Sequence, residues 1–206
     1  GQDQININFD EVESKIKNVN SSTYYPKLLE RFKSFDNTLS LEEIVLIYYG
    51  FSFQENYLKN KPDEGQLDIL SNNEEYEKLK IECEKILEKN PVSLVANNKM
   101  GFALFKLGKP ESEWKNYQKR YRDFRKVIVY SGNGLSCDSA FKVIYVSDEY
   151  NIIYDYFEIS KLGNQSLSEL CDHFTNEPSK FYKGKEIYFD ASRSLIRNQE
   201  IISTKK

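Results

Sequence analysis

The sequence lacks most of the features that identify an enzyme class from residues alone. It has one histidine, no Cys-x-x-Cys pair among three cysteines, and no apolar run near the roughly 20 residues that span a membrane. Its net charge is −3 with both signs interleaved, so no basic surface for nucleic acid is indicated. Any Ser-His-Asp or Cys-His mechanism would have to use His173 as its base.

A metal site at this histidine is disfavoured by the residues around it. On a strand, Cys171 and His173 would share one face and Asp172 would point to the other. Zinc needs three or four ligands, and no partner cluster is visible, so we interpret these as structural residues and expect no metal and no cofactor. The spacing of Cys83, Cys137 and Cys171 leaves two states open, one disulfide with a free thiol or three thiols.

Three further motifs favour structural interpretations. Residues 131–134 read Ser-Gly-Asn-Gly, which lacks the Gly-Lys-Ser/Thr ending of a phosphate loop, so we predict a turn. The adjacent carboxylates Asp148 and Glu149 are interpreted as a solvated strand end. Asp138-Ser139-Ala140 resembles a short acceptor motif for O-linked glycans on exported bacterial proteins. We therefore predict no catalytic residues.

What the sequence does contain is strong helical periodicity over its first 130 residues. A capping box at Ser40 and Glu43 starts a helix that is apolar nearly all round, which predicts a central, covered position. A second capping box, Ser71 with Glu74, predicts the start of a long helix that Pro91 ends. The predicted helices cover residues 9–19, 26–35, 41–53, 71–89, 93–107 and 110–128, with a short helical turn at 67–70.

Strand-like segments crowd the remainder of the chain. Residues 141–146, 154–159, 170–174 and 186–191 are rich in aromatic and β-branched residues or alternate in polarity, and Gly163-Asn164 reads as a turn. Helices followed by strands predict an α+β fold with a mainly antiparallel sheet of about four strands. We expect a helical repeat-like region at 8–130 and a sheet region at 136–195, packed as one compact unit.

The helices at 93–107 and 110–128 resemble a tetratricopeptide unit. Met100-Gly101 stands in its Leu-Gly place, Tyr117 in its aromatic place and Pro91 in its closing place, whereas Asn97 replaces the preferred Trp. Because the two helices of such a unit cross closely at the glycine, Gly101 is expected at their contact.

A second copy of this pattern is suggested around Gly50. The stretch from Tyr49 to Phe53 resembles the stretch from Met100 to Leu104, and the two glycines are 51 residues apart. That separation exceeds the 34-residue period by about the length of the polar segment 55–70. We therefore predict a first repeat made of residues 41–53 and 71–89, with an inserted loop between them.

In such a unit the inner face is lined by residues spaced along the first helix. Here these are Val95, Asn98, Phe102 and Phe105, a partly aromatic set that suits a peptide. The alternative is that the sheet or an N-terminal helix packs on this face. The choice between a binding surface and a covered surface stays open at this point.

The chain as a whole resembles a family of uncharacterised exported proteins from Bacteroidetes, over about residues 8 to 195. The resemblance implies a cleaved leader, which suits a chain that starts at Gly1, and a periplasmic or cell-surface location. It implies no activity. The residues that carry it are Tyr24-Tyr25-Pro26-Lys27-Leu28-Leu29, Leu41-Glu42-Glu43, Tyr48-Tyr49-Gly50, Ser131-Gly132-Asn133-Gly134, Ala140-Phe141, Glu149-Tyr150 and Tyr188-Phe189-Asp190-Ala191-Ser192.

Two functional hypotheses follow. The first is a non-enzymatic module that binds a protein or peptide on the helical-repeat surface. The second is a hydrolase of peptides or glycans, with carboxylates and tyrosines gathered at the junction of helices and sheet. A shallow apolar groove on Val95, Asn98, Phe102 and Phe105 would favour binding, and a deep cleft with convergent acidic residues would favour hydrolysis.

Overall fold

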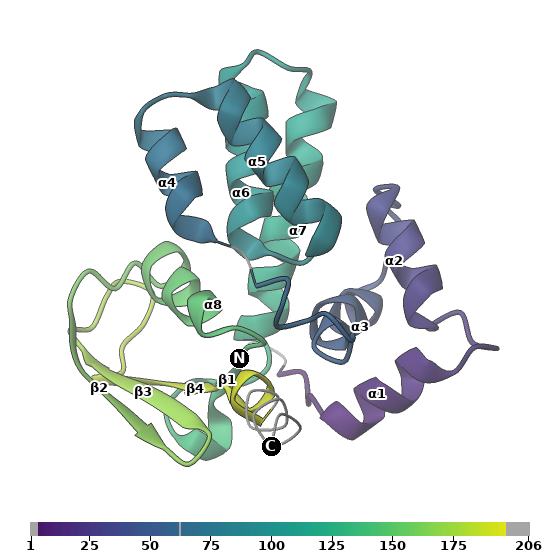
Figure 1. The fold of residues 1–206 in the computed structure, drawn as a ribbon. Helices are drawn as coiled ribbons and strands as arrows, with labels where there is room; N and C mark the ends of the chain where they lie inside the picture. Colours follow the sequence, from purple (N-terminus) through teal and green to yellow (C-terminus); the bar gives the residue numbers. More distant parts are fainter. Residues whose placement is uncertain (1–3, 62, 197–206) are drawn as a thin grey trace, which may run out of the picture. The chain divides into compact units, whose positions relative to one another are not determined.

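The computed structural model describes residues 4–61 and 63–196, and the fold is α+β as predicted (Figure 1). Contacts divide the chain into a helical unit, Glu13–Phe124, and a sheet unit made of Gly1–Val12 and Arg125–Lys206. The expected packing of residues 8–130 and 136–195 as one compact unit stays a prediction. The helices before residue 130 are α1 Phe9–Lys17, α2 Tyr25–Lys33, α3 Leu41–Phe51, α4 Glu64–Asn72, α5 Tyr76–Lys89, α6 Leu94–Lys106 and α7 Glu111–Val129.

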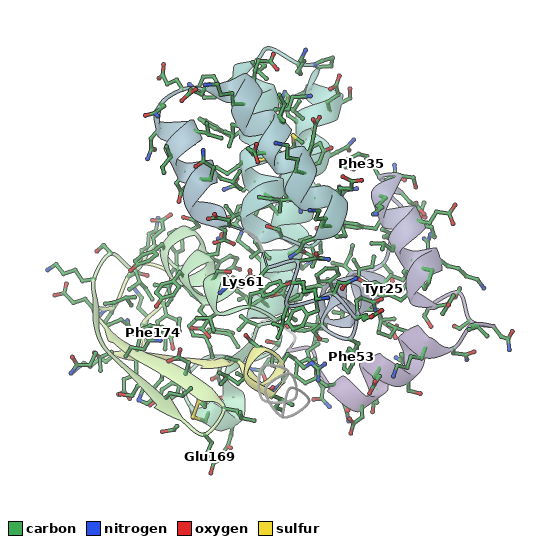
Figure 2. The ribbon with its side chains drawn as sticks, in the orientation of Figure 1. Tyr25, Phe35, Phe53, Lys61, Glu169 and Phe174 are labelled. Atoms are coloured by element: carbon green, nitrogen blue, oxygen red, sulfur yellow. A yellow bond between two sulfur atoms is a disulfide. The ribbon has the colours of Figure 1, made fainter. Side chains whose placement is uncertain are left out.

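Helix α3 is the covered central helix that its sequence predicts. Its capping box is complete, because Ser40 Oγ accepts from the Glu43 N–H at 3.2 Å and Glu43 Oε2 accepts from the Ser40 N–H at 2.8 Å. Tyr48 and Tyr49 are fully buried. The hydroxyl of Tyr25, labelled in Figure 2, donates to the carbonyl of Ile47 at 3.1 Å and ties α2 to α3.

The predicted capping box at Ser71 is wrong. Helix α4 continues through Ser71 to Asn72, because Leu67 and Leu70 are buried in the core and draw the segment into a full helix. Glu74 then takes a left-handed φ of 59°, and the Glu75 N–H donates to the Leu70 carbonyl at 3.0 Å. Helix α5 therefore begins only at Tyr76.

The predicted first repeat is also wrong. Helix α3 packs chiefly on α2, whereas α4 packs on both α5 and α6 (Figure 1). Helix α4 lies within the segment that was interpreted as an inserted loop, and its Asp68 pairs with Lys99 of α6 at 2.8 Å. The shared core of these helices consists of Leu67, Leu70, Leu79, Cys83, Ala96, Met100, Ala103 and Leu104.

Gly101 marks the close crossing of α6 and α7 that was expected there. A Cβ atom at this position would lie 3.2 Å from the Trp114 carbonyl oxygen and 3.2 Å from Gln118 Cγ. Both distances are shorter than ordinary van der Waals contact, so the absence of a side chain lets the two backbones approach.

The sheet has the order β1-β4-β3-β2 and is antiparallel except for the β1–β4 pair. The predicted strands at 170–174 and 186–191 are confirmed as β3 and β4, but only the first two residues of 141–146 pair, as β1. The turn predicted at Gly163 is wrong, because Gly163 lies in a bulge of β2 against Thr175, where a Cβ would meet Thr175 Oγ1 at 2.3 Å. The strands are β1 Phe141–Lys142, β2 Leu162–Ser168, β3 Cys171–Asn176 and β4 Glu186–Asp190.

The strand predicted at 154–159 is wrong. The chain instead forms helix α8, Val146–Asn151, which continues into the π-helical turn η2, Ile152–Tyr156. Within the predicted segment, Tyr154 and Asp155 are adjacent and both exposed, which alternation on a half-exposed strand would not allow. The Phe157 N–H donates to the Ile152 carbonyl at 3.0 Å, so local helical bonds override the strand propensity of these residues.

The cysteines adopt one of the two states that spacing left open. Cys137, in the 3-10 turn η1 (Cys137–Ser139), forms a disulfide with Cys171 at the start of β3. Cys83 is a free, buried thiol in the core of the helical unit. Burial raises the pKa of this thiol to about 12, so it is neutral at physiological pH.

Candidate functional site

The four residues predicted to line a peptide site share one face of α6. Val95, Asn98 and Phe102 are half-buried, whereas Phe105 is 55% exposed. Spacings of three, four and three residues place them along one side of the helix. The face is therefore covered at its start and open toward the C-terminal end of α6.

The covered part of this face joins α6 to α5. Phe102 meets the Tyr76 ring edge-on, with centroids 5.8 Å apart. Lys106 Nζ lies over both rings, 5.5 Å from the Phe102 centroid and 5.7 Å from that of Tyr76. An ammonium group over two aromatic faces is held by the ring quadrupoles while it remains in solvent.

The open part of the face joins α6 to α7. Phe105 meets Trp114 edge-on, with centroids 5.6 Å apart. Trp114 is half-buried, so the exposed Phe105 ring stands against a partly anchored indole. Aromatic residues thus form a line across three helices, and we name it the aromatic stripe: Tyr76, Phe102, Phe105 and Trp114.

A second candidate site, in the sheet unit, consists of three buried carboxyl groups: Asp148, Glu149 and Asp172. Asp148 and Glu149 are 2% and 0% exposed, so the prediction of a solvated strand end is wrong. The reason is that this segment folds as α8 and buries both side chains. Asp172 of β3 is 5% exposed, and its Oδ2 accepts from Gln165 Nε2 at 2.7 Å.

Asp172 is one of the groups that affect the protonation of Glu149. Burial, and secondarily the charge of Asp172, raise the pKa of Glu149 to about 9. Glu149 is therefore protonated at neutral pH. Neither Glu149 oxygen nor Asp172 Oδ1 has a hydrogen-bond partner among the described residues.

Accessibility limits what this pair can do. Both carboxyl oxygens of Glu149 are inaccessible to solvent, so a substrate does not reach them in this structure. Tyr150, next to Glu149 in the sequence, is 36% exposed and stacks on Tyr154 with centroids 6.3 Å apart. Burial, followed by the charge of Glu149, raises the pKa of Tyr150.

His173 and Cys171 do not form a metal site. The sulfur of Cys171 is bonded to Cys137, and the His173 ring stacks on Tyr188 with centroids 4.9 Å apart. Within residues 4–61 and 63–196, no three His, Cys, Asp or Glu side chains are arranged to hold a metal ion. The disulfide of Cys171 and the stacking of His173 on Tyr188 support a structural role for both residues.

The segment 131–134 is an irregular connection that follows α7, with a turn at Ser131, and its glycines have packing roles. A Cβ on Gly132 would lie 2.4 Å from the Ser139 carbonyl oxygen, and Gly134 has a φ of +69°. The Gly134 carbonyl accepts from the Tyr182 hydroxyl at 2.7 Å and from the Tyr188 N–H at 3.0 Å. This turn thus supports the sheet rather than a phosphate.

The proposed glycan acceptor lies beside the same turn. Asp138 is exposed and Ser139 is half-buried, with Ser139 Oγ donating to Asn133 Oδ1 at 2.7 Å. A modifying enzyme would have to break this bond to reach the hydroxyl. This hydrogen bond is consistent with the structural interpretation of Asp138-Ser139-Ala140.

Comparisons with known proteins complete this description. A family model described as "Domain of unknown function (DUF4919)" matches residues 10–200. No curated protein and no solved structure matches the chain. In the described part of the chain, no helix is both long enough and apolar enough to cross a membrane.

Proposed function

The chain belongs to the DUF4919 family, a domain of unknown function, and we propose that it is an exported, non-enzymatic module that binds a protein or peptide. The site is the α6 face of Val95, Asn98, Phe102 and Phe105, extended by the rest of the aromatic stripe. The observation that carries the proposal is the Phe105 ring, which is 55% exposed beside Trp114.

The arrangement of the stripe suits a side chain of a partner. Phe105 and Trp114 contact each other edge-on, so both rings are oriented before a ligand arrives. Pre-oriented aromatic residues lose little conformational entropy on binding, which is why they dominate binding energy at many interfaces. An apolar partner residue that covers Phe105 would remove this ring from water.

Polar groups next to the stripe suit a peptide backbone or an acidic side chain. Lys106 is held over the Tyr76 and Phe102 rings, and no carboxylate within the described residues pairs with it. Asn98 is half-buried on the same face and offers both a donor and an acceptor. We infer a partner segment with an apolar residue for Phe105 and a carbonyl or carboxylate for Lys106.

Export to the periplasm or cell surface, after removal of a leader, is supported by the Cys137–Cys171 disulfide. Disulfides persist in oxidising compartments and are rare where thiols are kept reduced. The hydrolase alternative gains no support from the described residues. Its best carboxyl pair, Glu149 with Asp172, has the Glu149 oxygens out of reach of a substrate.

The proposal is tested by selecting peptides from a displayed random library on the purified chain and measuring their affinities by fluorescence anisotropy. Phe105→Ala should weaken the selected peptides about 10-fold, which is the scale of a central aromatic contact. Ile81→Ala is the matched control, because Ile81 is an apolar residue on α5 with 46% exposure that lies outside the stripe. Failure to select any peptide, or an equal loss of peptide affinity in Phe105→Ala and Ile81→Ala, would overturn the proposal.

A further inference from the structure

The sheet unit contains a pocket with aromatic walls that none of the functions above uses. Its volume is about 370 Å³, within the range of small-ligand sites. The described residues that line it are Gln4, Val129, Tyr130, Gly132, Asn133, Phe141, Phe157, Phe181 and Tyr182, and none of these is acidic. The pocket thus combines ring surfaces with uncharged polar groups.

One wall is an aromatic ring held out toward solvent by an anchored loop. Phe181 is 50% exposed, yet the residues around it are fixed. Ser179 Oγ donates to the Phe157 carbonyl and accepts from the backbone N–H groups of Phe181 and Tyr182. The exposure of Phe181 is therefore built into the loop.

The inner wall is equally well fixed. Phe157 packs between Phe141 and Tyr182, with ring centroids 5.4 and 5.0 Å away. The Tyr182 hydroxyl is engaged by the carbonyls of Gly134 and Glu186. A ligand ring would consequently meet preorganised apolar surface, which lowers the entropic cost of binding.

The polar groups at the pocket are fixed as hydrogen-bond donors. Asn133 Oδ1 accepts from the Leu135 N–H at 2.9 Å and from Ser139 Oγ at 2.7 Å, so its Nδ2 donor remains for a ligand. Lys126 Nζ lies 5.2 Å from the centroid of the lining Tyr130 ring, and Lys180 Nζ lies 5.3 Å from that of Phe181. Neither lysine pairs with a carboxylate among the described residues, in a chain of net charge −3.

We propose that this pocket binds a carboxylate-bearing sugar ring, such as a uronic acid unit of a glycan. The C–H face of a sugar ring packs on aromatic surfaces, its hydroxyl oxygens accept from an amide such as Asn133 Nδ2, and its carboxylate complements Lys126 and Lys180. This ligand site is separate in sequence and composition from the peptide face on α6.

The test uses the full chain with methyl β-D-glucuronide, the neutral methyl β-D-glucoside, and phenylacetate as an aromatic acid. Binding is measured by saturation-transfer NMR and isothermal titration calorimetry. The glucuronide should bind in the millimolar range and at least about 10-fold more tightly than the glucoside. No binding of the glucuronide, equal binding of the two sugars, or tighter binding of phenylacetate would each overturn the proposal.

Substitutions in and beside the pocket test where the glucuronide binds. Phe181→Ala should abolish detectable binding of the glucuronide, and Lys180→Gln should weaken it several-fold while leaving the weak affinity for the glucoside unchanged. Leu135→Ala is the matched control, because Leu135 is 58% exposed and does not line the pocket. Circular dichroism and the Tm of each variant verify folding. Binding that survives Phe181→Ala in a folded variant would place the ligand elsewhere and overturn the assignment.

Discussion

Glu149 of helix α8 and Asp172 of strand β3 are both buried, 0% and 5% exposed, and the charge of Asp172 contributes to the raised pKa of Glu149. Ionising Glu149 is costly, because its carboxyl is buried and the charge of Asp172 opposes a second negative charge there. Asp172 Oδ2 itself accepts from Gln165 Nε2 at 2.7 Å.

The first prediction concerns the pH dependence of stability. The pKa of Glu149 is about 9 in the folded chain and near 4.5 in the unfolded chain, so the folded state binds more protons between these values. The stabilisation is complete below pH 4.5 and is lost as pH rises toward 9, at no more than ~1.4 kcal/mol per pH unit. Glu149→Gln removes this titration and should flatten the decline.

Urea unfolding of wild type and Glu149→Gln at pH 5, 7 and 9 measures this difference. The variant should gain stability relative to wild type as pH rises. Asp155→Asn is a suitable control, because Asp155 is an exposed carboxylate on the neighbouring turn η2. Parallel profiles of unfolding free energy against pH for wild type and Glu149→Gln would contradict the raised pKa of Glu149.

The second prediction compares two helical glycines. Gly101→Ala should destabilise the helical unit by ~1 kcal/mol or more, because the new methyl group would press on the Trp114 carbonyl and on Gln118. Gly65→Ala in α4 meets only Asp63 Oδ1 at 3.7 Å and should stabilise by up to ~1 kcal/mol through helix propensity. Thermal unfolding of both variants provides the measurement, and equal effects would refute the close crossing of α6 and α7.

The third prediction concerns the cysteines. The disulfide closes a loop with a sequence separation of 34 residues. Cys137→Ser should therefore cost about 3–4 kcal/mol by the chain-entropy relation. Urea unfolding under non-reducing conditions measures the loss of unfolding free energy. Dithiothreitol should lower the unfolding free energy of wild type to that of the variant.

Cys83 supplies an internal control for that measurement. Its thiol is buried and its pKa is raised to about 12, so iodoacetamide should label it only after unfolding. Mass spectrometry of the folded chain should show no alkylation without reductant and two modified cysteines with it. Labelling of Cys83 in the folded chain would indicate an open core in the helical unit.

The fourth prediction concerns Arg120, which is only 8% exposed. Its guanidinium lies 3.7 Å from the Phe35 ring centroid and 4.2 Å from that of Phe32, and Nη2 donates to the carbonyls of Phe32 and Lys33 at the end of α2. Burial lowers its pKa to about 10. Lysine cannot reproduce both the stacking and the paired bonds, so Arg120→Lys should destabilise by ~1–3 kcal/mol.

The exposed Arg122 offers the matched substitution for this test. Arg122→Lys on the same helix should change the unfolding free energy by less than ~0.5 kcal/mol. A similar loss in both variants would mean that helix composition, and not the contact with α2, is responsible.

Local chemistry made much of the helical unit predictable. Ser40 with Glu43, Pro26 in a first turn, and the apolar period of α3 each act within a few residues, so their effects can be read from the sequence. The capping box predicted at Ser71 was wrong because of tertiary packing. Ser71 satisfies a local capping pattern, but burial of Leu67 and Leu70 placed it inside the preceding helix.

The candidate sites were less predictable because they depend on pairing across the chain. Glu149 and Asp172 are 23 positions apart in the sequence, and nothing in the residues beside them indicates burial. One hint in the sequence indicated that Glu149 matters, because Glu149-Tyr150 is among the residues that carry the family resemblance. By contrast, the face of Val95, Asn98, Phe102 and Phe105 followed from spacing on one helix, and the structure shows how far each residue is covered.

The Cys137–Cys171 bond also changes what a protease could do to this chain. Between the two cysteines lie α8, η2 and the whole of β2, whose residues are exposed from Gly163 to Ser168. A cut in β2 would break the backbone, but both fragments would stay covalently joined. Outside a reducing compartment, the Tyr150–Tyr154 pair and strand β3 would thus remain parts of one molecule after nicking.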